Sequence, residues 1–443
     1  MTTFDNILEE AGPFGRCQKR IFALLCLVSL PFAGVYVGIV FQGFTPDHWC
    51  RVPAVVDRRQ TCGWTPGEGQ RWTAPLVNIS GELKPSSCER YDLDWNTTDL
   101  TCDPEDLDLD LTGVKDGWEY DYEGRNSFVT EFDLVCSDGW LVDMFQSTLN
   151  VGFLIGSFAF GYLADRFGRR LSFLVSNVIN VTSGMVVALA PNYISILVFR
   201  GVFGFAVKGG WMTCYVLMTE VVGKEYRRTV GILFQMLFSV GNLILPLLAY
   251  FITDWRWMQV TFAAPYILFV SYYWLVPESP RWLLSQNKAS TALQITEALA
   301  KENRQKLPQT QKHTFIFMFN WSDSVSMTTR FHLGVASDPR GLKAASCLLR
   351  FTSAVVYQGL IMRVGIAGGN VYLDFFISGL VEFPAAFLIL FTIERIGRRL
   401  PFATANIIAG VSCLITAFIP ESEETLRFRR SYGRVYLFKS EKK

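Results

Sequence analysis

Long apolar stretches recur along the chain, and they constrain its fold more than any other feature of the sequence. Eight uninterrupted stretches lie at 21–44, 141–164, 171–190, 194–222, 229–252, 257–276, 370–393 and 401–419. A helix of about 20 apolar residues crosses the hydrocarbon core of a bilayer. Only 18% of the residues are charged, whereas soluble proteins carry about a quarter. A soluble core would have to bury eight such helices almost without a polar face. We therefore predict an all-α polytopic membrane protein.

Basic residues near the ends of these stretches predict the orientation. Lys and Arg gather within 1–20 and at 165–170, 224–228, 280–281 and 394–399. If every stretch crosses, and 314–321 with 351–362 forms one further, broken span, these segments all fall on one side. Cytoplasmic ends of membrane spans carry an excess of Lys and Arg. The N-terminus 1–20 and the loop 277–313 are therefore expected in the cytoplasm, with span 1 at 21–44 and spans 2 to 6 within 141–276.

One large loop, 45–140, is expected on the outer side. It holds 20 Asp or Glu against 8 Lys or Arg, and two glycosylation acceptors, Asn78 and Asn96. Five cysteines are candidates for disulfides in an oxidising compartment: Cys50, Cys62, Cys88, Cys102 and Cys136. Five is odd, so one thiol should be free or pair elsewhere. The acidity serves either plain solubility or an anionic vestibule that concentrates cations.

A charged turn occurs twice, as GYLADRFGRR (161–170) and as ERIGRR (394–399). Gly161 is expected to permit a close helix approach, Asp165 to cap or pair, and Gly168 to form the turn. The turn residues are Asp165, Arg166, Gly168, Arg169 and Arg170 in the first copy, and Glu394, Arg395, Gly397, Arg398 and Arg399 in the second. When the broken span formed by 314–321 and 351–362 is counted, the two copies lie six spans apart and in the same orientation. Such a repeat indicates two parallel six-helix halves.

The turn resembles the signature of the major facilitator superfamily. That resemblance implies the superfamily fold, with a complete N-terminal half, and a gating role for the turn rather than a substrate site. The segments GFTPDHWC (43–50), VTEFDLVC (129–136) and VPESPRWLLSQ (276–286) are similar to the organic ion transporter (solute carrier 22) family. Within it, KGGWMTCYVLMTE (208–220), YQGL (357–360) and VEFPAAF (381–387) resemble the organic cation transporters. The likeness covers 1–306, 312–321 and 351–420.

Glu382 stands in the middle of the eighth span, and an acid inside a membrane is costly and usually functional. We expect it to face a cavity and sense a cation, although a structural pair with Lys208 is an alternative. The resemblance suggests an aromatic cage of Tyr36, Phe153, Trp211, Phe238, Trp321 and Tyr357, with Gln235 as a polar adaptor. Each of these aromatics could instead face lipid or simply pack.

Three further charged residues have expected roles near the cavity. Lys208 is expected to balance a carboxylate, and Asp143 to pair or attract cations. Arg200 is expected to tether the cytoplasmic halves of neighbouring helices.

No enzyme motif competes with a transport function. The sequence has no phosphate-binding GxxxxGK[ST] motif, and its three His lack metal-ligand spacing. We expect no cofactor, no metal and no nucleic-acid partner. A membrane potential of 100 mV is worth about 2.3 kcal/mol per charge, so facilitated uptake of a cation needs no coupling ion.

Two segments depart from the family pattern. Residues 322–350 carry several charges and separate 314–321 from 351–362, which together would make one span. The region 314–419 is expected to hold spans 7 to 9. We interpret 322–350 as an insert in span 7 that was introduced by splicing or by an error in the gene model. A functional loop is the alternative. After Pro420 the likeness stops, and the basic tail 420–443 holds no span, so about nine spans and an incomplete C-terminal half are expected.

The leading interpretation is a polyspecific organic cation transporter of the plasma membrane that works by alternating access. A carnitine or zwitterion transporter, an organic anion exchanger and a transport-inactive regulatory truncation are the alternatives. The outer loop could also support homo-oligomers.

Overall fold

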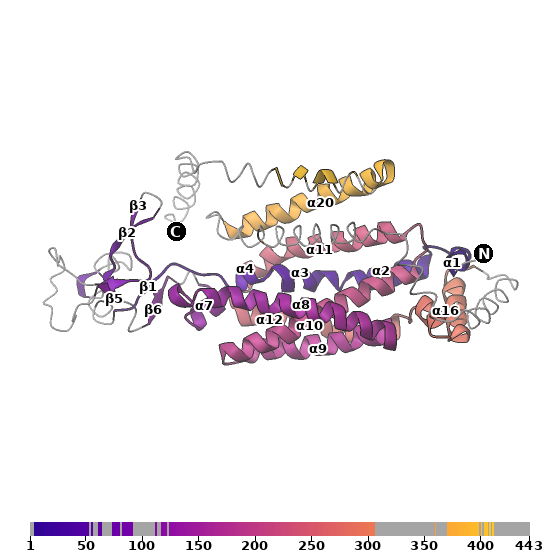
Figure 1. The fold of residues 1–443 in the computed structure, drawn as a ribbon, viewed down its shortest axis with the longest axis horizontal. Coiled ribbons are helices and arrows are strands. Elements are labelled where there is room, and N and C mark those ends of the chain that lie inside the picture. The colour runs from indigo at the N-terminus through magenta and orange to yellow at the C-terminus, as the bar shows by residue number, and fades with distance from the viewer. Residues whose placement is uncertain are drawn as a thin grey trace, which may run out of the picture.

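The long helices run side by side along one axis in the computed structural model (Figure 1). The strands lie at one end of this bundle, here called the strand end. The N-terminus and helix α16 lie at the other, the N-terminal end. The residues described are 4–52, 55, 61–63, 73–79, 82–91, 111–112, 117–121, 124–305, 359, 370–397, 400, 403–405, 407–408 and 410–411. The insert 322–350 and the tail 420–443 lie outside them.

Helices make up most of the described chain. Their bounds are α1 (Phe4–Glu10), α2 (Arg16–Cys26), α3 (Ser29–Val37), α4 (Ile39–Gln42), α7 (Phe128–Glu131), the 3-10 helix η1 (Cys136–Asp138), α8 (Trp140–Phe167), α9 (Arg169–Leu189), α10 (Tyr193–Val221), α11 (Arg227–Phe251), α12 (Trp255–Ala263), α13 (Pro265–Val270), α14 (Tyr272–Leu275), α15 (Pro280–Ser285), α16 (Ala289–Glu302) and α20 (Val371–Ile396). Within the described residues, six helical segments are long and apolar enough to cross a membrane.

The sixth predicted span, 257–276, is not one helix. It consists of α12, α13 and α14 end to end, and the first break falls at Pro265. Proline has no backbone N–H to donate to the preceding turn, so the α-helical ladder is interrupted there. Hydrogen bonds from Ile267 N to Ala264 O and from Trp274 N to Ser271 O carry the chain across the breaks.

Helices α8 and α10 approach each other closely because glycines face the contact. A Cβ at Gly152 would lie 2.2 Å from the carbonyl oxygen of Gly201, and one at Gly156 would lie 2.2 Å from that of Phe205. By contrast, a Cβ at Gly161 would meet nothing within 4 Å. The prediction that Gly161 permits the close approach is therefore wrong, because the contact lies at Gly152 and Gly156, nearer the beginning of α8.

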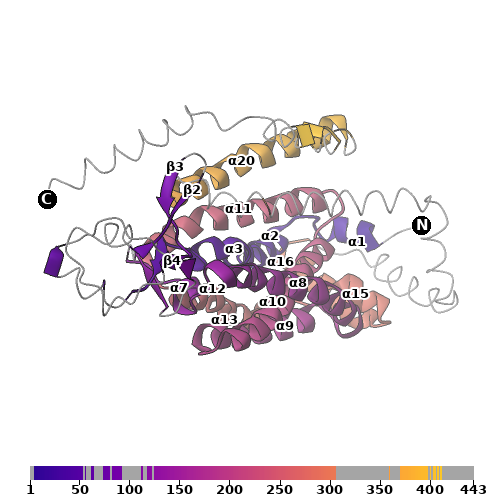
Figure 2. The ribbon, with the colours of Figure 1, turned by 60° about the vertical axis from the view of Figure 1, so that its left-hand side comes forward.

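Helix α20 lies along the outside of α11, as both views show (Figures 1 and 2). A Cβ at Gly379 of α20 would come within 3.0 Å of Leu243 Cδ2, so the small residue lets the two helices pack. On its other side α11 packs on α3, where a Cβ at Gly241 would meet Ala33 Cβ at 2.6 Å. This stacking of α3, α11 and α20 sets the geometry of the site described below.

Arg256 links α12, α9 and α7 at the strand end of the bundle. Arg256, in the first turn of α12, donates to the carbonyl oxygens of Ala188 (2.6 Å) and Ala190 (3.1 Å) at the end of α9, and it pairs with Glu131 of α7. The last carbonyls of a helix have no partner within the helix. One guanidinium therefore completes α9 and joins it to α7.

The outer loop contributes three small antiparallel sheets. Their pairs are β1 (His48–Cys50) with β6 (Trp118–Tyr120), β2 (Leu76–Ile79) with β3 (Glu82–Pro85), and β4 (Arg90–Tyr91) with β5 (Leu111–Thr112). The register places Cys50 opposite Trp118 and His48 opposite Tyr120. The strands thus begin directly after the first span and return the chain toward α8.

The N-terminal end carries a small helical layer of its own. Ile7 of α1 is buried in a cluster with Trp282 and Leu283 of α15. Asp5 accepts hydrogen bonds from both Arg227 of α11 and Arg281 of α15. The N-terminal helix is therefore fixed to the bundle through one carboxylate and an apolar face.

Candidate functional site

Four of the predicted cage residues meet inside the bundle, around a fifth aromatic ring. Tyr36 lies on α3, Phe153 on α8, Trp211 on α10 and Phe238 on α11. The Tyr36 ring centroid is 6.0 Å from that of Phe153 and 6.2 Å from that of Phe238, and Trp211 is 6.0 Å from Phe238. Phe32 occupies the centre, 4.0 Å from Trp211 and 5.8 to 6.1 Å from the other three. We call these five residues the aromatic cluster.

Phe32 was not predicted, although its spacing could have indicated it. Residues four apart lie on the same face of a helix, and Phe32 precedes Tyr36 by four on α3. Phe32 is buried, at 4% exposed, while Tyr36 and Trp211 are half-buried. The two rings that carry polar atoms therefore retain accessible surface beside the buried one.

A lysine ammonium already lies against the aromatic cluster. Lys208 Nζ is 5.7 Å from the Phe32 ring centroid and 5.9 Å from that of Phe153. Both distances are within the range of cation–π attraction. Among the described residues Lys208 forms no ion pair, so the role expected for it in balancing a carboxylate stays a prediction.

Two predicted residues, Gln235 and Phe238, share one face of α11 with Asn242. Gln235, Phe238 and Asn242 succeed each other at spacings of three and four residues, which places them on one side of the helix. Asn242 Nδ2 donates to Glu382 Oε2 of α20 at 3.5 Å. Glu382 is half-buried and Gln235 is exposed. The acid thus binds a residue that lies one helical turn from Phe238 of the aromatic cluster. Asn242 is a second residue that the sequence did not single out.

The repeated turn connects α8 to α9 at the N-terminal end. Gly168 has φ +109°, a backbone conformation that glycine adopts readily. The carboxylate of Glu278 accepts from the backbone N–H groups of Arg169 (3.1 Å) and Arg170 (3.2 Å). Glu278 therefore caps α9, where its charge also complements the positive end of the helix dipole.

Arg169 binds two neighbouring helices with its side chain. Its Nε and Nη2 donate to the two carboxylate oxygens of Glu220, at the end of α10, at 3.1 and 3.2 Å. It also pairs with Asp165 at 3.0 Å, although Asp165 is 76% exposed. The side chains of Arg169 and Glu220 are only 11% and 14% exposed. This two-pronged pair is the strong form of a charge-assisted hydrogen bond.

The second copy of the turn is described in part. Helix α20 ends at Ile396, and Gly397 follows with φ +87°, as Gly168 follows α8. Arg395 is exposed. The side chain of Glu394 and the residues Arg398 and Arg399 lie outside what the structure describes.

Known proteins resemble the chain over most of its length. The family model described as "Sugar (and other) transporter" matches residues 122–437. Solute carrier family 22 member 2 of Homo sapiens is 45% identical over 460 residues, covering 96% of this chain and 78% of the relative. Solute carrier family 22 member 3 of Mus musculus is 45% identical over 435 residues, with the same coverage.

The chain belongs to the solute carrier 22 family. Among solved structures, the xylose transporter XylE from E. coli in a partially occluded inward-open conformation has a TM-score of 0.53 and 18% identity, covering 86% of this chain and 74% of that one. The fold is therefore that of the major facilitator superfamily, and both fold and relatives are those of solute transporters, not enzymes.

A buried arginine forms a second polar group in this solute carrier 22 chain. Arg200 is 0% exposed, and its Nη1 donates to Gln259 Oε1 at 3.0 Å, an oxygen that also accepts from Gln42 Nε2 at 3.1 Å. Its guanidinium lies 4.2 Å from the Phe145 ring centroid. Phe145 is near the strand end of α8, opposite to the Asp165 turn. Arg200 does tether helices, but it does so at the strand end. The prediction placed it in the halves near the Asp165 turn, which were expected to be cytoplasmic, and that placement is wrong.

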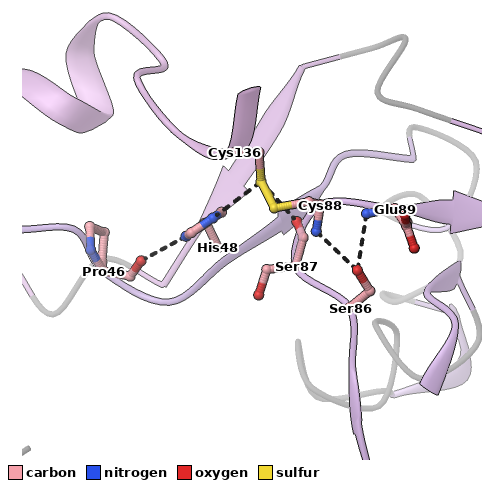
Figure 3. Close-up of a disulfide and its surroundings, with 7 residues drawn as sticks. All are labelled: Pro46, His48, Ser86, Ser87, Cys88, Glu89 and Cys136. Atoms are coloured by element: carbon pink, nitrogen blue, oxygen red, sulfur yellow. Dashed lines mark hydrogen bonds between the residues drawn. A yellow bond between two sulfur atoms is a disulfide. The ribbon is translucent and has the colours of Figure 1, made fainter. Parts of the chain in front are cut away.

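A disulfide fixes the outer loop to the start of α8. Cys88 and Cys136 are bonded, with Cα atoms 5.6 Å apart (Figure 3). Cys136 opens η1, directly before α8. Cys62 is also disulfide-bonded, and Cys102 lies outside the described residues. Cys50 is free and buried, so it leaves the set of disulfide candidates.

Cysteine and histidine gather at this disulfide without making a metal site. His48, Cys88 and Cys136 are the one group of potential ligands found in the described part of the chain, with ligand atoms within 4.8 Å of one another. Both sulfurs belong to the disulfide, whereas a metal binds thiolates. His48 Nδ1 instead donates to the Pro46 carbonyl oxygen, 3.1 Å away (Figure 3).

The remaining predicted residues that the structure describes lie apart from the aromatic cluster. Asp143 is exposed in the first turn of α8, ten residues before Phe153, or about 15 Å along the helix axis. Asn78 is in strand β2. Trp321, Tyr357 and Asn96 lie outside the described residues. Arg166, exposed at the end of α8, donates to Tyr162 Oη at 3.2 Å.

Proposed function

We propose that this protein transports small organic cations across the plasma membrane by alternating access. The single observation that carries the proposal is the aromatic cluster, in which rings from four helices gather one turn away from Asn242, the hydrogen-bond partner of Glu382. Each ring face attracts a cation by about 0.5 to 2 kcal/mol and also accepts apolar bulk. A site of this kind selects charge without demanding one shape, which suits many different amines.

The direction of transport follows from charge. The membrane potential supplies about 2.3 kcal/mol per elementary charge at 100 mV, which is enough to accumulate a monovalent cation. In this proposal the N-terminus is cytoplasmic, and the Asp165–Arg170 turn is a latch on the inner side. The disulfide-bearing outer loop faces the outside, where it supports contacts between copies of the chain.

Lys208 favours a second candidate, a carrier of zwitterions such as carnitine. A quaternary ammonium could use the rings while the carboxylate of the same molecule pairs with the Lys208 ammonium, which lies 5.7 Å from Phe32. Sodium dependence of uptake and competition by carnitine distinguish this candidate from a carrier of simple cations.

The test is uptake of radiolabelled tetraethylammonium by cells expressing the chain, normalised by surface biotinylation. We expect saturable uptake that grows as the membrane potential becomes more negative. Glu382→Gln should reduce uptake about tenfold or more, because a charge attraction in a low-dielectric site is lost. Asp374→Asn removes a carboxylate from the first turn of the same helix and should leave uptake close to that of the unaltered chain. Equal uptake by the Glu382→Gln and unaltered proteins would refute the proposed role of Glu382.

A further inference from the structure

A cavity of about 420 Å³ opens at the N-terminal end, outside the site described above. Its lining comes from the beginnings of α2 and α9, from α14 and the residues that follow it, and from α16. Typical ligand pockets measure roughly 300 to 1,000 Å³. The cavity therefore has room for a headgroup-sized ligand.

The polar wall of this cavity carries one net positive charge. Arg20, Arg170 and Glu302 line the cavity, and Arg20 pairs with Glu302 at 3.2 Å. Arg170 has no carboxylate partner for its side chain within the described residues. Its Nη2 donates to the Tyr273 carbonyl, and its Nε is buried without a hydrogen-bond partner. By contrast, Arg169 beside it is paired with both Glu220 and Asp165.

The Arg170 guanidinium is also held in place. It lies 4.2 Å from the Tyr273 ring centroid. A stacked guanidinium keeps its planar set of donors in one orientation, which matches the oxygens of a phosphate. The position and the unbalanced charge together favour an oxyanion as the ligand.

The rest of the cavity lining is mostly apolar, and part of it is exposed. Trp274 is 78% exposed, Tyr273 50% and Leu275 46%, and all three line the cavity. Tryptophan and tyrosine are enriched where membrane-spanning helices meet the headgroup layer. These side chains end the broken sixth span, so they lie at that depth. A ligand here meets both the Arg170 guanidinium and the exposed rings beside it.

We propose that this cavity binds the phosphate of an anionic phospholipid. The phosphate oxygens accept hydrogen bonds from Arg170 and from the exposed side of Arg20. The acyl chains lie along Trp274 and Leu275. Basic pockets of this kind between spans bind acidic headgroups. A free phosphate shares the headgroup chemistry, but it leaves the apolar wall uncovered. This inference does not depend on which solute the protein carries.

The test is lipid binding to the purified full chain, measured by native mass spectrometry with phosphatidylserine and with phosphatidylcholine of the same acyl chains. We expect phosphatidylserine to bind more tightly. Arg170→Gln should weaken its binding about fivefold, as expected for one basic residue at an anionic headgroup, and Arg170→Lys should restore part of it. Arg51→Gln, an exposed arginine in the outer loop, is the matched control and should bind as the unaltered chain does.

The other arms separate the sources of the phosphate. Trp274→Ala keeps every charge and should still weaken lipid binding, because the acyl chains lose their contact. If Arg170→Gln does not fold, phosphatidylserine binding by Arg20→Gln and Trp274→Ala tests the proposal instead. Unchanged phosphatidylserine binding in these variants overturns the proposal. Competition by millimolar inorganic phosphate, together with no effect of Trp274→Ala, also overturns it and assigns the site to a soluble anion.

Discussion

Replacing Lys208 by Met should change the affinities for cations and zwitterions in opposite directions. The Lys208 ammonium lies 5.9 Å from the Phe153 ring centroid. A guest ammonium on the other face of this ring, at a typical 6 Å, would lie about 12 Å from it. Two like charges at that distance repel by about 1.4 kcal/mol with an effective dielectric constant of about 20. Removing one of them should strengthen binding of a permanent cation about tenfold.

The assay is equilibrium binding of radiolabelled tetraethylammonium to the purified full chain in nanodiscs. Lys208→Met keeps most of the side-chain volume and removes the charge, whereas Lys208→Arg keeps the charge and should leave affinity unchanged. A zwitterion whose carboxylate pairs with the ammonium should bind Lys208→Met more weakly. Thermal melting of each variant establishes that the bundle is intact.

One result refutes this reasoning. If Lys208→Met melts like the unaltered protein and binds tetraethylammonium no more tightly, the guest does not occupy the aromatic cluster. Weaker tetraethylammonium binding in both Lys208→Met and Lys208→Arg would instead mean that this lysine only holds the helices in position.

Three further predictions concern stability and reactivity. Arg169→Ala should lower the free energy of unfolding by about 3 to 5 kcal/mol, because it leaves the nearly buried Glu220 carboxylate unpaired; a melting curve like that of the unaltered chain would contradict this. Gly156→Leu should prevent correct packing, since even a Cβ would lie 2.2 Å from the Phe205 carbonyl oxygen, while Gly161→Leu, with open space around it, should be tolerated; surface expression of both variants measures the difference. Burial raises the pKa of the Cys50 thiol, so it should stay protonated at neutral pH and react slowly with maleimide until the pH rises or the protein unfolds. Fast labelling of native protein at neutral pH would show that this thiol is accessible as a thiolate.

Apolar length predicted the long helices well because lipid permits few alternatives. The predicted span 141–164 lies within α8, and 194–222 nearly coincides with α10. The break in the sixth span was missed because the span was predicted from its apolar composition. One proline, Pro265, hardly changes that composition, although it removes a backbone N–H donor from the helix. The sheets of the outer loop were also missed, since strands of two to four residues leave almost no periodic signal.

The candidate site was predictable only in part, for a geometric reason. The family likeness pointed to Tyr36, Phe153, Trp211 and Phe238, and these lie together. The spacing of four residues between Phe32 and Tyr36 puts both on one face of α3. That Phe32 fills the space between the other rings depends on how four helices are rotated, which spacing does not show. The close approach at Gly156 rather than Gly161 depends on the same rotation.

The distribution of hydrogen bonds explains how such a bundle can accept guests of different shape. Its ends are fixed by charged groups, Arg169 with Glu220 at one end and Arg256 with Glu131 at the other. The aromatic cluster between them is packed by ring contacts of 4.0 to 6.2 Å. Dispersion contacts are individually weak and have little directional preference, so rings can shift without leaving a polar group unpaired. Fixed ends would keep the helices in register while the middle adapts, and the polyspecific recognition of cations that we propose requires this combination.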